Sequence, residues 1–334
     1  MGYWLGRRVL VTGGAGLIGS YVTEKLVERG AVVRVADNLE RGRLEHLSHC
    51  IGDIEFHRLD LRDLTACRMV TGGIEVVFHL AARTVGAGYS QLHHGELFTS
   101  TLMVSLNVLQ AAIDNKIARV LVTSSSCVYP DDSSNPIPEE EGALRSPEQV
   151  NEGYGWAKRM CELQAQYFSK EHGLEVAIVR PTNVYGPRYP FELPEPHVIP
   201  AIVLRVLRGE DPLHVWGSGE QKRSFIHARD AAEAIIRITE RYANGRPVNV
   251  SSTSETPVGE LARLILNLSG NPNRKIVFER DRPEGAKHKT ANLTRFCEAT
   301  GGFEPQVTIE EGLRELILAA RQHLSLLAGA GRGL

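Results

Sequence analysis

The sequence has no excess of charge of either sign and no long apolar run. Its 334 residues carry 38 basic and 40 acidic side chains, for a formal charge of -2. A protein that binds nucleic acid or an anionic membrane surface usually carries a basic patch, which this balance does not suggest. No apolar stretch approaches the roughly 20 residues of a membrane span, and the first residues do not resemble a secretory signal. We therefore expect neither nucleic acid nor membrane as a partner.

Cysteine is also scarce, and its spacing excludes two kinds of site. The five cysteines are odd in number, scattered, and contain no CxxC pair: Cys50, Cys67, Cys127, Cys161 and Cys297. Such spacing predicts neither a disulfide framework nor a zinc site, so we expect no metal. Free thiols are typical of a reducing compartment, and we expect a cytoplasmic protein.

What the first half contains is an alternation of short β-branched runs with longer amphipathic stretches. Strands are predicted at 7–13, 31–37, 54–60, 74–82, 118–125 and 175–181, and helices at 18–30, 101–116 and 155–173. Strand–helix alternation indicates a parallel sheet covered by helices on both faces. The predicted fold class is α/β, a doubly wound parallel sheet of Rossmann type.

The texture changes beyond Pro181. Prolines cluster over 186–200, which predicts loops rather than regular structure. Short strands at 212–219 and 274–281 and a helix at 258–270 indicate a smaller C-terminal α/β lobe that binds substrate. A helix at 229–245 returns to the first lobe, and the tail from 327 is expected to fray. The predicted domains are 1–180 with a returning segment at about 226–252, and a discontinuous lobe of 181–225 and 253–320.

A glycine-rich turn stands between the first strand and the first helix. "VLVTGGAGLIGS" places Gly13, Gly14, Gly16 and Gly19 where the backbone can approach a pyrophosphate at a helix N-terminus. The alternative is a glycine-rich turn without function, but the strand–turn–helix context favours a dinucleotide site.

The second strand ends at Asp37, at the spacing where a carboxylate binds the adenosine ribose. A carboxylate repels a 2′-phosphate, so Asp37 favours NAD over NADP, although Arg41 and Arg43 weaken that preference. Asp60, after the third strand, is a candidate contact of the adenine, and "HLAA" would pass its backbone beside the cofactor.

"YGWAK" places Tyr154 and Lys158 on one face of a helix. A lysine beside a phenol lowers the pKa of the phenol from about 10 and allows it to act as a base near neutrality. The same spacing occurs by chance in many helices. It gains weight here because a serine-rich strand end and a glycine fingerprint precede it.

These motifs together resemble the extended short-chain dehydrogenase/reductase family, over nearly the whole chain. The resemblance rests on "TGGAGLIG", Asp37, "HLAA", "SSSCVY", "YGWAK" and "RPTNVYGP". It implies that Ser125 hydrogen-bonds the substrate, with Ser124 and Ser126 as alternative registers. It also implies that Tyr154 exchanges a proton and that Lys158 supports Tyr154 and the cofactor ribose. The further cofactor-site candidates are Leu17, Ile18, Asn38, Leu61, Leu80, Ala81, Ala82 and Pro181.

Members of that family mostly act on nucleotide-linked sugars, and the second half carries matching residues. The resemblance implies that Trp216 and Arg223 meet the base and diphosphate, and that Arg282 is a second diphosphate contact. Arginine suits a diphosphate because its planar fork donates two parallel hydrogen bonds. The remaining substrate-site candidates are Ser126, Asn183 and Val198. Taken singly, each charge could be a solvated surface charge, and Trp216 a core aromatic.

Cys127 and His197 resemble a narrower group. "SSCVYP" and "HVIPA" match the sub-group that contains GDP-L-fucose synthase. In that sub-group the cysteine and the histidine are the acid/base pair for epimerisation beside a 4-keto group. A thiolate can remove a proton and an imidazolium can return one. The alternatives are a small buried hydrophobe for Cys127 and a loop histidine for His197.

The leading hypothesis is a nucleotide-sugar epimerase that works with bound NAD through a 4-keto intermediate, at C3 or C5 of a GDP-sugar. GDP-L-fucose synthases use NADPH, which Asp37 disfavours, whereas GDP-mannose 3,5-epimerases have a lysine in place of His197. The alternatives are a fucose-synthase-like epimerase/reductase, a simple 4-epimerase, and a non-catalytic sensor of the same fold. The resemblance also implies a homodimer that forms through the helices at 101–113 and 155–168.

Overall fold

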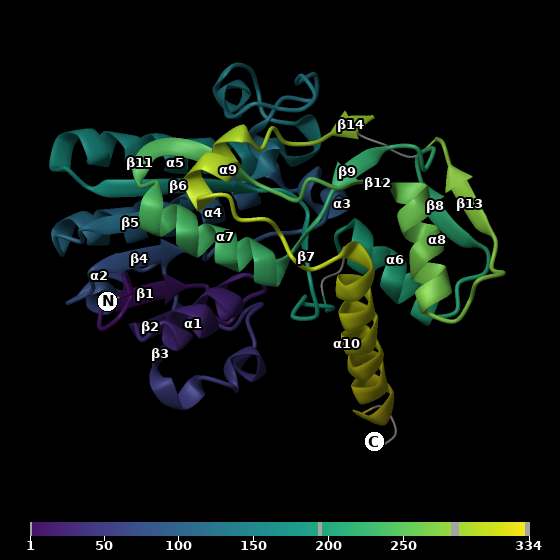
Figure 1. Ribbon diagram of the computed structural model, residues 1–334, viewed down its shortest axis with the longest axis horizontal. Coiled ribbons are helices and arrows are strands. Elements are labelled where there is room, and N and C mark those ends of the chain that lie inside the picture. The colour runs from purple at the N-terminus through teal and green to yellow at the C-terminus, as the bar shows by residue number, and fades with distance from the viewer. Residues whose placement is uncertain (1, 193–195, 282–286, 331–334) are drawn as a thin grey trace.

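The structure is a computed structural model that describes residues 2–192, 196–281 and 287–330, with no side-chain description for 329 and 330. At its centre is a seven-stranded sheet in the order β11-β6-β5-β4-β1-β2-β3 (Figure 1), with every neighbouring pair parallel. The strands are β1 (Arg8–Thr12), β2 (Val32–Asp37), β3 (Ile54–Arg58), β4 (Val76–His79), β5 (Arg119–Thr123), β6 (Glu175–Pro181) and β11 (Asn244–Val250). The predicted parallel α/β sheet of Rossmann type is confirmed.

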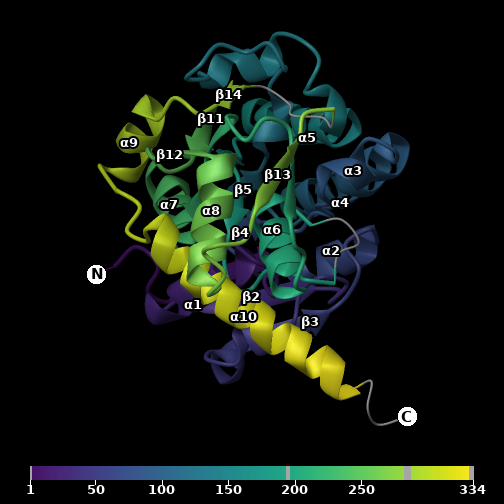
Figure 2. The same ribbon diagram turned by 90° about the vertical axis from the view of Figure 1, so that its right-hand side faces the viewer.

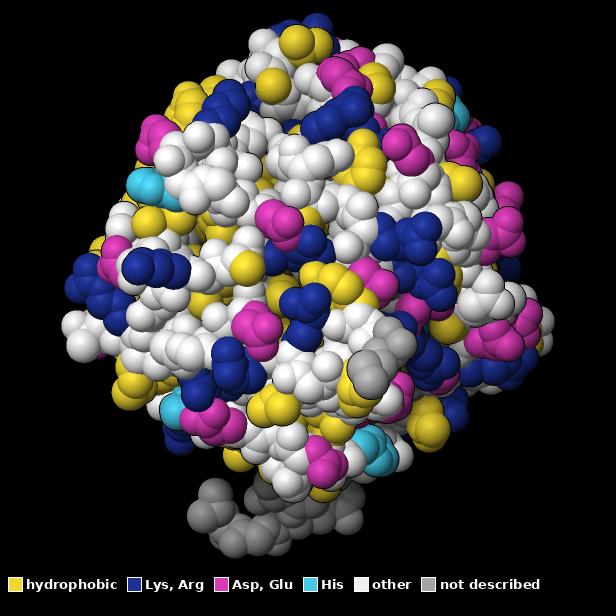
Figure 3. Space-filling model, turned by 60° about the vertical axis from the view of Figure 1, so that its left-hand side comes forward, with side chains coloured by type: hydrophobic (Ala, Val, Ile, Leu, Met, Phe, Trp, Pro, Cys, Tyr) yellow, Lys and Arg dark blue, Asp and Glu magenta, His cyan; other side chains and the backbone are white. Residues whose placement is uncertain are grey.

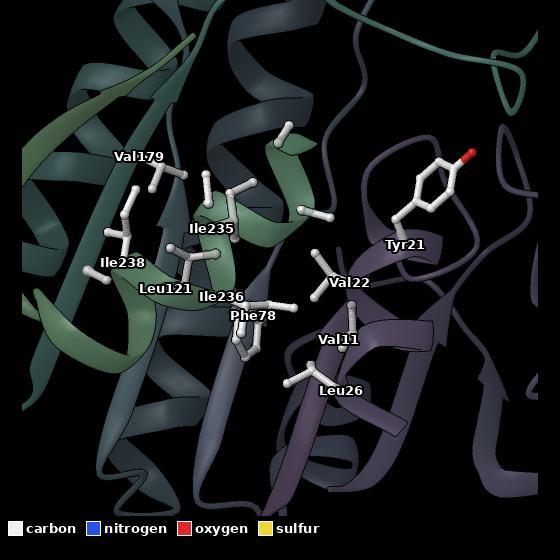
Figure 4. Close-up of a cluster of buried hydrophobic side chains, with 14 of the residues drawn as sticks. Val11, Tyr21, Val22, Leu26, Phe78, Leu121, Val179, Ile235, Ile236 and Ile238 are labelled. Atoms are coloured by element: carbon white, nitrogen blue, oxygen red, sulfur yellow. The ribbon is translucent and has the colours of Figure 1, made fainter. Parts of the chain in front are cut away.

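Helices cover both faces of the sheet because successive strand side chains point to opposite sides. One face packs α1 (Gly19–Glu28), α7 (Ala228–Arg241) and α9 (Thr294–Thr300) against Val11, Phe78, Leu121 and their neighbours (Figure 4). The other face packs α2 (Leu64–Thr71), α4 (His94–Asp114) and α5 (Glu152–His172) around Leu10 and Val77. Short helical segments connect these elements: η1 (Leu44–Leu47), η2 (Ile51–Asp53), α3 (Ala87–Ser90), η4 (Glu139–Ala143) and η5 (Gln149–Asn151).

A third hydrophobic cluster lies in the smaller part of the molecule, to the right in Figure 1 and toward the viewer in Figure 2. It is built by α6 (Val198–Leu207), α8 (Val258–Leu268) and α10 (Ile309–Ala330). Three small sheets accompany these helices: β13 (Ile276–Glu279) with β8 (Leu213–Trp216), β12 (Glu255–Pro257) and β14 (His288–Lys289) with β9 (Lys222–Ser224), and β10 (Ile226–His227) with β7 (Val184–Tyr185). The domain boundaries given above stay a prediction.

Two local expectations were wrong. The proline-rich segment was expected to be loop throughout, but α6 begins at Val198 and contains Pro200. Pro200 lies in the first turn of the helix, where its missing N–H would have had no partner within the helix. The tail 327–334 was expected to fray, but α10 continues to Ala330, and 331–334 lie outside the described residues.

Among the described residues, α4 alone has the length and composition to cross a membrane, with a mean hydropathy of 1.3. This result differs from the expectation that no apolar stretch is long enough. In the fold α4 packs beside α5, α2 and β4. On the face shown in Figure 3, basic and acidic side chains are interspersed among scattered hydrophobic ones.

Candidate active site

The strand order reverses between β1 and β4, and a cavity opens there at the carboxyl ends of the strands. In doubly wound sheets this switch point is the usual ligand site. The cavity holds about 970 Å³ and is lined by residues from both parts of the molecule. Gly14 of the glycine turn does not line it, because a Cβ there would point at the Val35 side chain, 2.7 Å away. The other cofactor, catalytic and substrate candidates among the described residues do line it: Gly13, Gly16, Leu17, Ile18, Gly19, Asp37, Asn38, Asp60, Leu61, Leu80, Ala81, Ala82, Ser125, Ser126, Cys127, Tyr154, Lys158, Pro181, Asn183, His197, Val198, Trp216 and Arg223. Arg282 lies outside the described residues.

The glycine turn can pack tightly against its neighbours only because its side chains are absent. Gly13 has a φ of +68°, and a Cβ there would lie 2.9 Å from the Ala81 Cα. A Cβ on Gly19, the first residue of α1, would lie 2.1 Å from the Gly13 carbonyl oxygen. The turn therefore holds strand, helix and the "HLAA" backbone close together, and the N-terminus of α1 faces the cavity. This cradle fits the pyrophosphate of a dinucleotide.

Asp37 stands at the end of β2, as expected, and its carboxylate is held by the backbone. One oxygen accepts the Ala15 N–H at 3.0 Å and the other accepts the Leu39 N–H at 2.9 Å. Burial raises the pKa of Asp37 above its usual value, and these two hydrogen bonds oppose the rise. Of the two nearby arginines, Arg43 forms an ion pair with Glu192, whereas Arg41 lines the cavity.

The backbone of "HLAA" is positioned by buried side chains behind it. Thr12 Oγ1 accepts the N–H groups of Leu80 and Ala81, both at 3.2 Å. The same hydroxyl lies 2.9 Å from His79 Nδ1, and His79 Nε2 lies 3.0 Å from Ser105 Oγ. Because Thr12 Oγ1 already accepts two N–H bonds, we infer that it donates to Nδ1, which leaves Nε2–H to donate to Ser105. His79 is thus used as a neutral ring.

Tyr154 and Lys158 share one face of α5, with Lys158 Nζ 5.6 Å from the centre of the Tyr154 ring. Lys158 Nζ donates a hydrogen bond to the Thr123 carbonyl oxygen at 2.7 Å. The expectation that Lys158 lowers the pKa of Tyr154 was wrong for the ligand-free protein. Burial raises that pKa, and the hydrogen bond to Ser125 and the charge of Arg41 oppose the rise only partly. Burial likewise lowers the pKa of Lys158.

Cys127 lies in a short helical turn, η3 (Ser126–Val128), directly after β5. Ser125 caps the turn, and its Oγ accepts the Cys127 N–H at 3.1 Å. Burial raises the pKa of the thiol, and the carboxylate of Glu148 raises it further. Both influences favour the thiol as the resting form.

Hydrogen bonds from buried side chains hold the η3 turn in place. Arg159 Nε donates to the Val128 carbonyl oxygen at 3.0 Å. The Tyr129 hydroxyl donates to Asn249 Oδ1 at 2.5 Å and accepts from Arg180 Nη1 at 3.1 Å. Arg180 is itself paired with Glu162 through two hydrogen bonds of 2.8 and 2.6 Å. The turn that presents Cys127 is thus tied to α5, β6 and β11.

His197 occupies the N-cap position of α6, without a side-chain capping bond, and lines the same cavity. Its Nδ1 lies 3.0 Å from the Tyr189 hydroxyl, which also accepts the His197 N–H at 2.9 Å. Burial in the cavity wall, together with the charge of Arg41, lowers the pKa of His197. Both influences favour a neutral resting ring.

Three of the residues proposed for the substrate come from the smaller part of the molecule. Trp216 ends β8 and Arg223 lies in β9, while Val198 is the first residue of α6. Asn183 Nδ2 donates to the Ser224 carbonyl oxygen at 2.9 Å, so part of its amide supports the backbone.

Two charged residues beside Cys127 were missed. Glu148 and Lys289 line the cavity and form an ion pair with each other. No motif marks either residue, and they are 141 positions apart in the sequence. Only the packing of the two parts of the molecule brings them together.

The comparison with protein families agrees with this geometry. The family model described as "NAD dependent epimerase/dehydratase family" matches residues 9–251. The chain belongs to this family. It is accordingly an enzyme of the NAD-dependent nucleotide-sugar epimerase and dehydratase class, and the family uses NAD or NADP.

Relatives within the family carry different activities. A dTDP-4-dehydro-6-deoxy-D-allose reductase from Streptomyces bikiniensis is 32% identical, with 96% of this chain and 98% of that protein covered. GDP-mannose 3,5-epimerase 1 from Oryza sativa subsp. japonica is 29% identical, with 93% and 82% covered. The solved structure of a UDP-glucose 4-epimerase from Thermotoga maritima with UDP-glucose has a TM-score of 0.84 at 30% identity, with 95% and 99% covered. The family assignment thus leaves sugar, base and net reaction open.

Proposed function

We propose that this enzyme is an epimerase that inverts a carbon beside C4 of a GDP-sugar, with NAD retained as a catalytic oxidant. The observation that carries the proposal is the meeting of two sets of residues in one cavity. Ser125, Tyr154 and Lys158 form the first set, and Cys127 and His197 form the second. A 4-epimerase needs only the first set.

A nicotinamide cofactor, held by the glycine turn and Asp37, would supply reversible oxidation at C4 of the sugar. Tyr154 receives the proton of the C4 hydroxyl, and Ser125 hydrogen-bonds the same oxygen. Lys158, anchored on the Thr123 carbonyl, supplies positive charge next to the phenol. A cation bound in this cavity would also lower the pKa of Tyr154, which burial raises in the ligand-free protein.

A ketone at C4 makes the hydrogens on its neighbouring carbons acidic. Cys127 follows β5 and His197 precedes α6, so two separate segments supply the two proton carriers. Inversion requires removal of a proton on one face and delivery on the other, and a thiol and an imidazole suit that exchange near neutral pH.

The GDP-sugar assignment rests on similarity. GDP-mannose 3,5-epimerase is among the relatives, and Trp216 and Arg223, which the family resemblance assigns to the base and the diphosphate, line the cavity. NAD is proposed because Asp37 would repel a 2′-phosphate and because Arg43 is engaged with Glu192. We further propose a cytoplasmic location, on the basis of the free cysteines.

The direct test is exchange of solvent deuterium into the sugar, followed by mass spectrometry. Cys127→Ser is expected to lose net inversion at C3 or C5, because a serine hydroxyl is too weak an acid to replace the thiol, while exchange through His197 on its own face should persist. Transient reduction of the cofactor should persist, since it needs only Ser125, Tyr154 and Lys158. His197→Asn should lose both net inversion and exchange, because it removes the base. Net inversion at the wild-type rate per folded molecule of Cys127→Ser, measured by NMR of the product, would refute the catalytic role of the thiol.

Tyr154→Phe serves as the complementary variant. Loss of the phenol proton should reduce turnover about a hundredfold or more. Binding of GDP-mannose should be unchanged, and this can be measured by protection against thermal unfolding.

An epimerase/reductase is the second candidate, because a 4-keto-sugar reductase is among the relatives and Arg41 lines the cavity. The two candidates differ in cofactor use. A reductase consumes NADPH in proportion to product, whereas the proposed epimerase turns over many times on one equivalent of NAD. Tighter binding of NADP(H) than of NAD(H), with stoichiometric oxidation, would favour the reductase.

A further inference from the structure

Cys127 lies against a largely buried ion pair. Glu148 precedes η5 and Lys289 lies in β14, and their paired side chains are only 14% and 18% exposed. One Glu148 oxygen pairs with Lys289, and the other accepts a hydrogen bond of 2.5 Å from Asn151 Nδ2. A Cβ on Gly155 would lie 2.5 Å from the Pro147 side chain and 2.6 Å from the Cys127 carbonyl oxygen, so the segment that carries Glu148 packs beside Cys127. The carboxylate therefore has two partners, Lys289 and Asn151, and lies next to the proposed proton carrier.

A buried ion pair contributes little to the free energy of folding compared with apolar side chains of the same volume. Removing two charges from water costs several kcal/mol per ion, and apolar replacements are often neutral or stabilising. Both residues nevertheless line the active-site cavity, and the chemistry described so far uses neither. Their position beside the thiol suggests a role in its protonation.

We propose that Glu148, kept ionised by Lys289, holds Cys127 in its thiol form, so that Cys127 enters the reaction as a proton donor. This inference rests on the proposed function for the reaction itself. Glu148 is a positioning residue, because it acts through Cys127 and not on the sugar.

The proton transfers balance. Neutral His197 removes the proton from the carbon beside the C4 ketone and leaves an enolate. On the opposite face, the carbon takes the proton of Cys127 Sγ: a C–H bond forms, the S–H bond breaks, and its electron pair stays on sulfur. The negative charge passes from the enolate to the thiolate, near the Lys289 ammonium. After product leaves, the imidazolium returns its proton to the sulfur through solvent.

The charges around Cys127 come from three segments. Glu148 lies before η5, and Lys289 lies in β14. Tyr154 and Lys158 lie in α5. Arg223 lies close enough to Lys289 for its charge to oppose the rise in the Lys289 pKa. After burial, the carboxylate is the largest influence that raises the pKa of the thiol, and Lys289 opposes it. Removing the carboxylate alone should therefore lower the pKa of the thiol, and removing the ammonium alone should raise it.

The test is the pH dependence of iodoacetamide labelling of Cys127 in the full-length protein, read on its peptide by mass spectrometry. The wild-type midpoint should lie above the value of about 8.5 for an unperturbed cysteine. Glu148→Gln should move it down by about one unit, which increases labelling near pH 8 roughly tenfold. Lys289→Met should move it up, and Glu148→Asp should restore behaviour close to wild type.

Glu152→Gln is the matched control, because it removes a carboxylate four residues away that does not line the cavity. The double variant Glu148→Gln/Lys289→Met leaves no unpaired charge, and its midpoint should lie between those of the single variants. A midpoint that Glu148→Gln leaves unchanged or moves up would overturn the proposal. Labelling needs no sugar, so absence of deuterium exchange with a shifted midpoint would contradict only the epimerase assignment.

Discussion

At the scale of single residues, burial sets the protonation of the site more than sequence neighbours do. Lys158 was expected to lower the pKa of Tyr154, yet its ammonium bonds a backbone carbonyl and burial raises that pKa. Burial likewise favours the thiol of Cys127 and the neutral ring of His197. Motifs locate these groups, but their protonation depends on enclosure, which no local pattern records.

The same reasoning explains which site residues could be predicted. Strand-end and helix motifs placed Asp37, Cys127 and Tyr154 in one cavity, because the carboxyl ends of parallel strands meet at one edge of the sheet. Glu148 and Lys289 could not be found in this way. Each belongs to a connecting segment, and their pairing exists only once the two parts of the molecule pack together.

His79 provides a residue-scale prediction for pH. Burial lowers its pKa from 6.5 to about 3. Below about pH 6.5 the unfolded chain therefore binds a proton at His79 that the native state does not bind. The contribution of His79 to the free energy of unfolding is complete above that pH and is lost as the pH falls. Urea unfolding should show a loss of about 2 kcal/mol between roughly pH 7 and pH 5 from this residue.

The matched variant is His79→Gln. It should be less stable than wild type near neutral pH, because the bonds to Thr12 and Ser105 are weakened, but its stability should change less on acidification. An equal change in both proteins would contradict a neutral His79. His227, whose pKa burial also lowers, to about 4, acts in the same direction in both.

At the scale of elements, the sheet and its helices followed from alternation of strand-like and helix-like runs. The failures have physical causes. Pro200 suggested a loop, but proline is tolerated in the first turn of a helix, where α6 contains it. Helix α10, which no motif marked, is held by tertiary contacts with α6 and α8. Its stability therefore comes from packing that local sequence does not reveal.

The start of α1 supplies the element-scale prediction. Gly19→Ala would place a Cβ 2.1 Å from the Gly13 carbonyl oxygen, which must move the glycine turn away from α1. Binding of both NAD and NADP, measured by calorimetry, should weaken at least tenfold. Gly52→Ala is the control, because a Cβ there has no heavy atom within 4 Å. Unchanged dinucleotide affinity in Gly19→Ala would show that the cradle does not bind the pyrophosphate.

At the scale of the whole molecule, α4 and α5 lie side by side and expose apolar side chains. Met103 and Leu106 of α4 and Leu163 and Tyr167 of α5 are all at least 39% exposed. Burial of such a surface is favourable, and a second copy of the chain would provide an equally apolar partner. We therefore keep the prediction of a homodimer formed through these two helices.

Light scattering should give the mass of a dimer at micromolar concentration. Leu106→Asp should shift the protein toward monomer, because it would bury a charge in the interface. Leu318→Asp, at an exposed position of α10, should leave the dimer intact. A monomeric wild type would contradict the prediction.

The anchoring of the η3 turn has a consequence for how this enzyme could change. Arg159 and Tyr129 hold the turn through the Val128 carbonyl, Asn249 and Arg180, and none of these bonds uses the side chains of Ser126 or Cys127. Those two positions are therefore free to vary while the turn stays in place. Substitutions at Ser126 and Cys127 alone can therefore replace one reaction by another while the inherited fold is kept. Natural selection, or a designer, can exchange the chemistry here without rebuilding the dinucleotide site.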